Sequence, residues 1–318
     1  MMASEMPAAV APPGMSTDFK QNSDLWPSLI AVSVISLVIM TFAILIRLYA
    51  KGIKTKNMGW EEYLSTFSVI IIIAWTVIYD VSCHLGITKH QWNVKASEIP
   101  RIFNLLNICD ILYGPMLGTA KFALLLQLRR HALLPTTPKN RMNWLIYPTG
   151  VVIFGYYFSC IFQFAFQCVP RRGLWDPSAN PKCGNMPALT FAAAAFGLLT
   201  NLMLYALLVW LIIIASPNQL GGWLALGPIN IVALFGIVTS ITTVYYRIPF
   251  TDPSVDLTYH VAIVGIWAMA EYAAIILVGC IPSFGVWIGG KKVERHAEKV
   301  MEFETGSELL ETKPAGAV

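Results

Sequence analysis

Seven apolar segments, each long enough to cross a lipid bilayer, constrain this chain more than any other feature. They cover residues 26–50, 63–82, 101–128, 144–166, 187–215, 223–246 and 260–288. About 20 apolar residues in a helix span the hydrocarbon core of a bilayer. Helices satisfy all their backbone hydrogen bonds internally, as a lipid environment demands. We therefore expect an all-α fold, a seven-helix transmembrane bundle over residues 26–289.

The composition excludes several classes of function. Hydrophobic residues make up 56% of the chain and charged residues only 13%, against about 25% charged in soluble domains. The net charge of +4 comes from Lys and Arg beside the apolar segments, which indicates contact with the lipid bilayer and no nucleic acid. The sequence has no Walker loop, dinucleotide fingerprint, HExxH or CxxC motif. We expect no metal and no cofactor.

The distribution of basic residues predicts the orientation in the membrane. Basic residues are most concentrated in the first and third loops and in residues 290–318. The positive-inside rule places these segments in the cytosol and the N-terminus outside or in a lumen. Residues 1–25 lack the basic and apolar regions of a cleavable signal, and we predict a disordered tail there. Residues 290–318 are predicted to form a cytosolic tail.

The third segment carries polar residues at helical spacing. Asn107, Asp110, Gly114, Gly118 and Lys121 follow one another at steps of three or four and so share a helix face. Ionisable side chains in hydrocarbon are costly unless paired or hydrated, so they indicate an interior site.

Glu271 in the seventh segment provides a second buried carboxyl. At 1.5 Å per residue, Asp110 lies ~13 Å and Glu271 ~16 Å below the outer ends of their segments, which is a similar depth. A carboxyl in a low-dielectric interior favours its protonated form, and that form can act as a general acid. We predict Asp110 and Glu271 as catalytic acid and base, with Asp80 of the second segment as a further candidate.

Aromatic residues accompany these carboxyls along the segments, and aromatic faces stabilise developing cations. A cavity of this kind suits protonation of an epoxide or alkene on a lipophilic prenyl chain, followed by cyclisation. The predicted substrate-binding residues are Trp75, Tyr79, Tyr113, Trp267, Tyr272 and Asn107.

A structural interpretation of the same residues stays open. Asp110 would then hydrogen-bond Asn107 or a neighbouring helix, and Glu271 would pair with Lys121 or with an asparagine such as Asn201. Lys121 is expected to be architectural, either in an ion pair or reaching the headgroups. The aromatic residues would belong to the core or to the interfacial belts.

Two cysteines lie in the fourth loop, which is predicted to be outside. Cys168 and Cys183 are separated by a stretch rich in Pro, Gly and Asn. In an oxidising compartment we expect them to form a local disulfide. The alternative is two free cysteines.

Several short motifs occur in order along the membrane segments. They are Arg47-Leu-Tyr-Ala-Lys51, Gly59-Trp-Glu-Glu-Tyr63, His84 to Trp92, Ala120 to Arg129, Phe166-Gln-Cys168, Trp175-Asp-Pro177, Cys183, Glu271 and Cys280-Ile-Pro282. Together they resemble the fungal rhodopsin-like seven-helix family, whose members include receptor-like proteins and proteins encoded beside secondary-metabolite genes. The resemblance implies the seven-helix fold.

The chain departs from the family pattern in three places. The paired Asp of the family is Glu61-Glu62, the Asp of its fifth helix is replaced around Asn201, and its basic loop between helices five and six reads SPNQLGG. The seventh segment also has no lysine that could form a Schiff base with retinal. Loss of the basic loop argues against coupling to a cytosolic protein partner.

Three functions are compatible with these patterns. Architecture and chemistry are similar to those of fungal membrane-bound terpene cyclases, and we predict a cyclase acting on a lipophilic small molecule in the endoplasmic reticulum or another endomembrane. The alternative is a receptor-like sensor without retinal, in the plasma membrane. A transporter ranks third, because no inverted repeat or pair of broken helices is evident.

Overall fold

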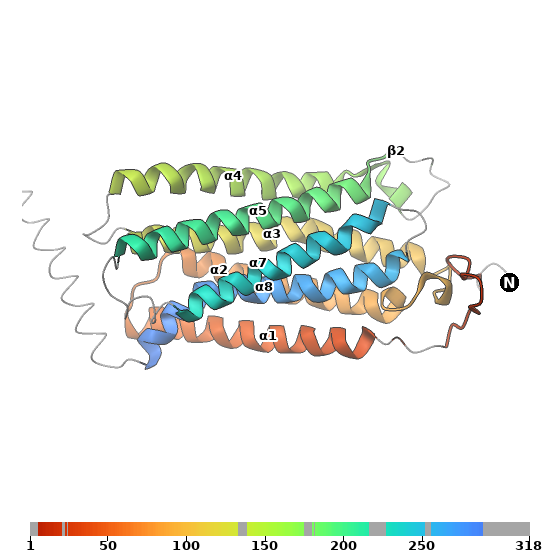
Figure 1. Cartoon of the computed structure of the whole chain (residues 1–318), viewed down its shortest axis with the longest axis horizontal. Helices are drawn as coiled ribbons and strands as arrows, with labels where there is room; N and C mark the ends of the chain where they lie inside the picture. The colour runs from red at the N-terminus through yellow and green to blue at the C-terminus, as the bar shows by residue number, and fades with distance from the viewer. Residues whose placement is uncertain are drawn as a thin grey trace, which may run out of the picture.

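The structure, a computed structural model, describes residues 6–20, 23, 25–132, 139–174, 180, 182–215, 227–251 and 256–288. Within these ranges lie seven helices long and apolar enough to span a membrane, which confirms the predicted fold class. They are α1 (Leu25–Tyr49), α2 (Trp60–Ser82), α3 (Ile99–Ala132), α4 (Lys139–Ala165), α5 (Met186–Ala215), α7 (Gly227–Arg247) and α8 (Leu257–Ile288) (Figure 1). The predicted tail of residues 290–318 and the SPNQLGG loop lie outside the described residues.

The outer surface of the bundle is apolar, as expected of a chain surrounded by lipid. On α1 alone, large apolar side chains point outward at Val34, Val38 and Phe42, which are 53–62% exposed. A water-soluble protein rarely exposes a contiguous apolar surface of this extent. The protein is a multi-pass membrane protein.

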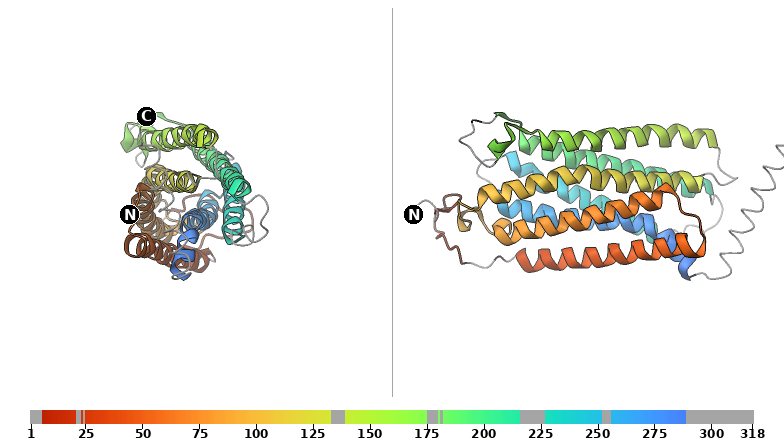
Figure 2. Two further views of the ribbon diagram at one scale, coloured as in Figure 1. Left: turned by 90° about the vertical axis from the view of Figure 1, so that its left-hand side faces the viewer. Right: turned by 180° about the vertical axis from the view of Figure 1, so that it is seen from behind.

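The helices run alternately up and down, and α8 lies inside the ring formed by the others (Figure 2). Of the apolar window of α8, 67% is buried, the largest fraction among the seven helices. We call the end of the bundle where α1 ends and α2 begins the basic end, and the other the opposite end. The central position of α8 brings its polar side chains into contact with several helices.

The described part of the N-terminal segment differs from the predicted disordered tail. Residues 6–20 run along the loop that precedes α3. Backbone hydrogen bonds join Ala8 N to Val94 O at 2.9 Å and Ala96 N to Met6 O at 2.9 Å. These bonds satisfy backbone groups of two segments outside the long helices, and composition alone does not reveal such pairing.

The loop between α2 and α3 is fixed to the start of α8. His90 stacks between Trp92 and Tyr259, with ring centroids 4.6 and 4.7 Å away. Its Nδ1 contacts the carboxylate of Asp256, which also accepts a hydrogen bond from the Gln91 backbone N–H at 3.0 Å. The loop is therefore packed and anchored.

A short hairpin follows α4 at the opposite end. Strand β1 (Cys168–Val169) pairs antiparallel with β2 (Lys182–Cys183), with Cys168 opposite Cys183. The two cysteines form a disulfide, whereas Cys83, Cys109, Cys160 and Cys280 are free and buried.

Part of the polar face predicted on α3 packs against α4. A Cβ on Gly114 would lie 2.5 Å from the backbone O of Tyr157, and one on Gly118 would lie 2.9 Å from the Tyr157 Cβ. The two glycines allow the helices to approach closely. Asn107 lies in the same interface, where its Nδ2 donates to Phe164 O at 3.0 Å. This part of the face is an interhelical contact instead of an interior site.

Candidate functional site

A cavity of about 100 Å³ lies between helices in the half of the bundle near the opposite end. Its lining comes from α2, α3, α5, α7 and α8, together with Phe250 just beyond α7. Five predicted site residues line it: Asp110, Trp75, Tyr79, Tyr113 and Tyr272. The structure therefore brings five of the predicted residues together around one cavity.

Three rings form an aromatic wall of the cavity. Trp75 stacks on Tyr79 with centroids 4.8 Å apart and meets Tyr272 edge-on at 5.5 Å. The indole Nε1 of Trp75 donates to Cys109 O at 3.1 Å. Hydrogen bonding thus fixes the ring orientation, and a fixed aromatic face can stabilise a cation in front of it.

Two tyrosine hydroxyls are also bound to helix carbonyls. Tyr79 donates to Val261 O at 2.8 Å, and Tyr113 donates to Ala193 O at 3.0 Å. Gly265 makes the position of the Tyr79 ring possible, since a Cβ there would lie 2.2 Å from the Tyr79 Cζ. The tyrosines therefore contribute ring surface to the cavity while their hydroxyls hold neighbouring helices.

Asp110 and Arg247 bring opposite charges to the cavity without forming an ion pair. Both residues line it, yet no Arg247 nitrogen lies within 4.0 Å of an Asp110 carboxylate oxygen. Among the described residues, the Asp110 carboxylate accepts no hydrogen bond, and the buried Nε of Arg247 has no partner. Arg247 Nη1 donates to Thr190 O at 2.7 Å. The Asp110 carboxyl and the Arg247 Nε are therefore two polar groups of one cavity that have no hydrogen-bond partner among the described residues.

Glu271 does not line this cavity. Its Oε1 accepts hydrogen bonds from Asn201 Nδ2 and Ser240 Oγ, both at 2.8 Å, and Asn201 Nδ2 also lies 2.6 Å from Ser240 Oγ. The carboxyl thereby connects α8 to α5 and α7. This arrangement matches the structural alternative, in which Glu271 pairs with an asparagine.

The remaining predicted site residues lie elsewhere. Asp80 accepts a hydrogen bond from Ser33 Oγ at 3.1 Å, between α2 and α1, and Asn107 contacts α4 as described above. Trp267 is half-buried on α8 and does not line the cavity. The three were predicted from depth and spacing, which do not specify the neighbouring helix.

Lys121 is fully buried and reaches neither Glu62 nor the headgroups. Its Nζ donates to Gly197 O at 2.9 Å and to Thr200 Oγ1 at 2.8 Å, and it lies 5.4 Å from the Tyr157 ring centroid. Within the described part of the chain, no carboxylate lies within 4.0 Å of it. Lys121 contacts α5 and α4, as expected of an architectural residue.

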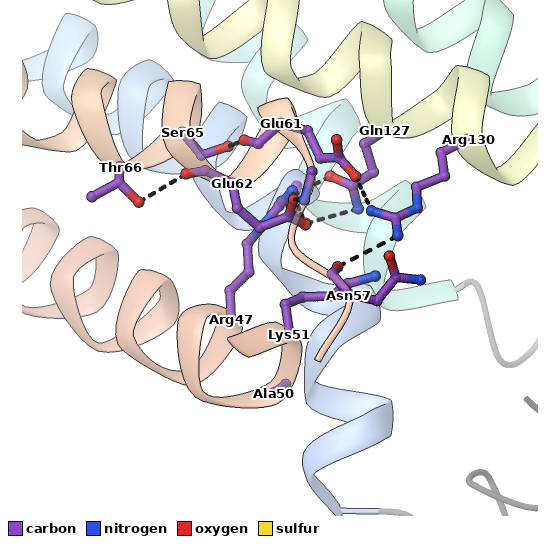
Figure 3. Close-up of polar contacts among 12 residues, drawn as sticks. Arg47, Ala50, Lys51, Asn57, Glu61, Glu62, Ser65, Thr66, Gln127 and Arg130 are labelled. Atoms are coloured by element: carbon purple, nitrogen blue, oxygen red, sulfur yellow. Dashed lines mark hydrogen bonds and ion pairs between the residues drawn. The ribbon is translucent and has the colours of Figure 1, made fainter. Parts of the chain in front are cut away.

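A second polar cluster lies at the basic end (Figure 3). Arg47 of α1 is 1% exposed, and its Nη2 pairs with Glu62 of α2 at 3.4 Å. Arg47 Nη1 donates to Gln127 Oε1 at 2.8 Å and to Gly279 O at 2.6 Å. Gln127 Nε2 donates to the same carbonyl at 2.9 Å. The cluster joins α1, α2, α3 and α8.

A neighbouring ion pair extends this cluster to the surface. Arg130 of α3 pairs with Glu61, and its Nη2 also lies 3.4 Å from Asn57 O (Figure 3). The Glu62 Oε2 accepts from the Gly59 backbone N–H at 2.7 Å. Both glutamates lie in the first turn of α2, where a negative charge interacts favourably with the helix dipole.

Sequence reasoning missed two features of these sites. Arg247 is not among the predicted site residues, although the end of an apolar segment is where a long cation can turn inward. The cluster around Arg47 was represented only by separate motifs. The signal was present in the Glu61-Glu62 pair, because two carboxylates at a membrane boundary require nearby cations.

The motifs around Arg47, Glu61-Glu62, residues 120–129 and Cys280-Ile-Pro282 lie far apart in sequence and meet in this cluster or beside it. A family model, the fungal rhodopsin domain, matches residues 46–288. The chain belongs to the fungal rhodopsin domain family. The match begins one residue before Arg47 and ends with α8, so it covers the whole cluster.

Two curated relatives are similar to this chain. A SAT4 family membrane protein of Emericella nidulans is 26% identical over 233 residues, covering 72% of this chain and 54% of the relative. Fugralins biosynthesis cluster protein 2 of Gibberella zeae is 23% identical over 265 residues, covering 79% of this chain and 63% of the relative. The chain thus spans just over half to under two thirds of these relatives. No solved structure matches.

Proposed function

We propose that this fungal rhodopsin-like protein is a membrane-embedded enzyme of secondary metabolism that cyclises a prenylated substrate by acid catalysis, as terpene cyclases do. The proposal rests on the Asp110 carboxyl. This group accepts no hydrogen bond from the described residues, and it lines a cavity with an aromatic wall. A proton donor and fixed aromatic faces are the two components that this chemistry requires.

The reaction would be an isomerisation that needs no co-reactant. Protonated Asp110 donates its proton to an epoxide oxygen, the C–O bond breaks, and a carbocation forms. An alkene π pair of the same chain attacks the cation and closes a ring. Loss of a proton to the Asp110 carboxylate ends the sequence and restores the acid.

In this proposal Glu271 is not the base that the sequence suggested. Its hydrogen bonds to Asn201 and Ser240 make it a positioning residue for α8, which carries Tyr272 into the aromatic wall.

The similarity to a protein named for a biosynthesis cluster supports a place in secondary metabolism. The cavity of about 100 Å³ is smaller than pockets that enclose a whole drug-sized ligand. It would therefore enclose the reacting end of a prenyl chain, while the rest of the chain extends between helices or into lipid.

The test is conversion of a farnesylated epoxide by the full chain in yeast microsomes, with products identified by mass spectrometry. We expect Asp110→Asn to lower the rate by at least about 100-fold, in the range typical of losing a general acid. Glu271→Gln keeps an oxygen that can accept both hydrogen bonds and should stay within severalfold of wild type. Product formation that survives Asp110→Asn would refute the proposal.

A receptor-like sensor is the second candidate, favoured by the Arg47 cluster that links four helices at the basic end. Ligand binding in the cavity would then change the position of α8 against Arg47. A fluorophore on Met58→Cys, in the loop before α2, can report this movement because the free cysteines of the described chain are buried. A ligand-dependent spectral shift without product formation would favour the sensor over the enzyme.

A further inference from the structure

The guanidinium of Arg247 forms no ion pair among the described residues, although it lines the same cavity as the Asp110 carboxyl. Among the described residues, no carboxylate oxygen lies within 4.0 Å of its guanidinium. The buried Nε has no hydrogen-bond partner, and Nη1 is bound to the neutral carbonyl of Thr190. Arg247 is half-buried at the end of α7, and an anion beside a partly desolvated cation lowers the cost of its burial. When Asp110 is neutral, the described lining of the cavity therefore carries one positive charge and no negative charge.

We propose that Arg247 binds the anionic group of the cavity ligand, which is therefore a lipophilic monoanion of the carboxylic acid class. The inference rests on the proposed function in one respect: an acid role requires a neutral Asp110, and a neutral Asp110 leaves the Arg247 charge uncompensated. A ligand carboxylate supplies the missing charge and accepts a hydrogen bond from Nε.

The geometry of the lining fits an amphiphile of this kind. Arg247 and Thr190 lie at the ends of α7 and α5 nearest the opposite end of the bundle, whereas Leu106, Val264 and Ala268 provide apolar lining. A guanidinium presents its donors in a planar fork that matches a carboxylate. The anionic group would sit at Arg247, with the hydrocarbon chain extending along the apolar lining.

The preference for an anion over a neutral ligand is measurable directly. The full chain in phosphatidylcholine nanodiscs is incubated at pH 8 with tritiated farnesoic acid or with its methyl ester, and protein-free nanodiscs correct for partitioning. We expect the acid to bind at least tenfold more tightly than the ester. Equal affinity of the two probes would overturn the inference, and this comparison needs no variant.

Variants then assign the preference to Arg247. Arg247→Gln should bring the two affinities within about twofold, and Arg247→Lys should retain part of the preference because it keeps the charge but loses the fork. Arg101→Gln is the matched control, since Arg101 is an exposed arginine on α3, and it should leave the preference unchanged. An undiminished preference in monodisperse Arg247→Gln would also overturn the inference.

Two further experiments identify the source of the anion and distinguish the anion-binding proposal from the enzymatic proposal. If phosphatidic acid in the nanodiscs abolishes binding of farnesoic acid, the site holds a lipid headgroup and the substrate assignment is wrong. If Asp110→Asn retains the acid preference while wild type forms no cyclised product, the anion site stands and the enzymatic proposal fails. If wild type cyclises a neutral epoxide through Asp110 without any acid preference, the reverse holds.

Discussion

The Arg47–Glu62 pair is the most buried ion pair among the described residues. The two side chains are 2% and 0% exposed, so water cannot compensate the loss of either partner. Breaking a buried pair on one side typically costs about 3–5 kcal/mol, because the remaining charge stays buried. Removing one partner is therefore expected to cost more stability than the intact pair contributes.

The first prediction compares two adjacent glutamates. Glu62→Ala should lower the unfolding free energy by roughly 3 kcal/mol or more, as expected for an uncompensated buried Arg47. Glu61→Ala should cost about 1 kcal/mol or less, because its partner Arg130 is 30% exposed and can be hydrated. Thermal unfolding of both variants in the same detergent measures the difference.

Similar losses for the two variants would show that Arg47 finds another counter-charge. The double variant Arg47→Met/Glu62→Leu provides the control. Because it removes both charges, it should recover part of the stability lost in Glu62→Ala.

The structure places some of the predicted residues at the cavity and their sequence neighbours elsewhere. Tyr79 and Tyr272 line the cavity, whereas Asp80 and Glu271, each one position away, do not. Consecutive side chains point about 100° apart on a helix. A side chain one position away can therefore face another helix instead of the cavity. Depth along a segment can be read from the sequence, but the rotation of each helix depends on its packing partners.

Among the helices, the pair α3 and α4 packs closely through small residues. Gly114 and Gly118 bring α3 against the backbone and side chain of Tyr157. In membranes, such close approach replaces the hydrophobic effect as a source of helix association.

The second prediction uses two glycines in these two helices. Gly114→Ala should destabilise the protein, because its Cβ would lie 2.5 Å from the Tyr157 backbone O and the helices must separate. Gly155→Ala in α4 is the matched control, since a Cβ there has nothing within 4 Å. It should be neutral or slightly stabilising, because alanine is the better helix former.

Thermal unfolding in detergent measures this comparison as well. A Gly114→Ala variant as stable as Gly155→Ala would mean that α3 and α4 leave room for a Cβ between Gly114 and Tyr157.

The helices themselves could be predicted well, because their apolar length is a property of local sequence. The third segment, predicted over 101–128, is observed as Ile99–Ala132. The N-terminal segment could not be predicted in the same way. Its bonds to Val94 and Ala96 depend on a loop that lies far away in the sequence, and nothing in its composition indicates that loop.

For the whole molecule, the orientation in the membrane is the property that decides access to both polar sites. The third prediction is that the opposite end faces the lumen or the exterior, as the positive-inside rule implies. An N-glycosylation acceptor added before Met1 should be glycosylated, giving a mass shift that glycosidase treatment removes. The same acceptor added after Val318 should stay unmodified.

Glycosylation at the C-terminal acceptor alone would reverse the orientation. The Arg47 cluster would then face the lumen, and the sensor hypothesis would lose its cytosolic contact surface.

The separation of Asp110 from Arg247 has a consequence for stereochemistry. While Asp110 is neutral, the charge of Arg247 generates an electric field across the cavity, and the low dielectric of the surroundings weakens it little. A ligand with a permanent dipole has a lower energy in one direction along this field than in the reverse. Even a small cavity could in this way select one end-to-end orientation of a flexible chain, and with it the face on which a ring closes.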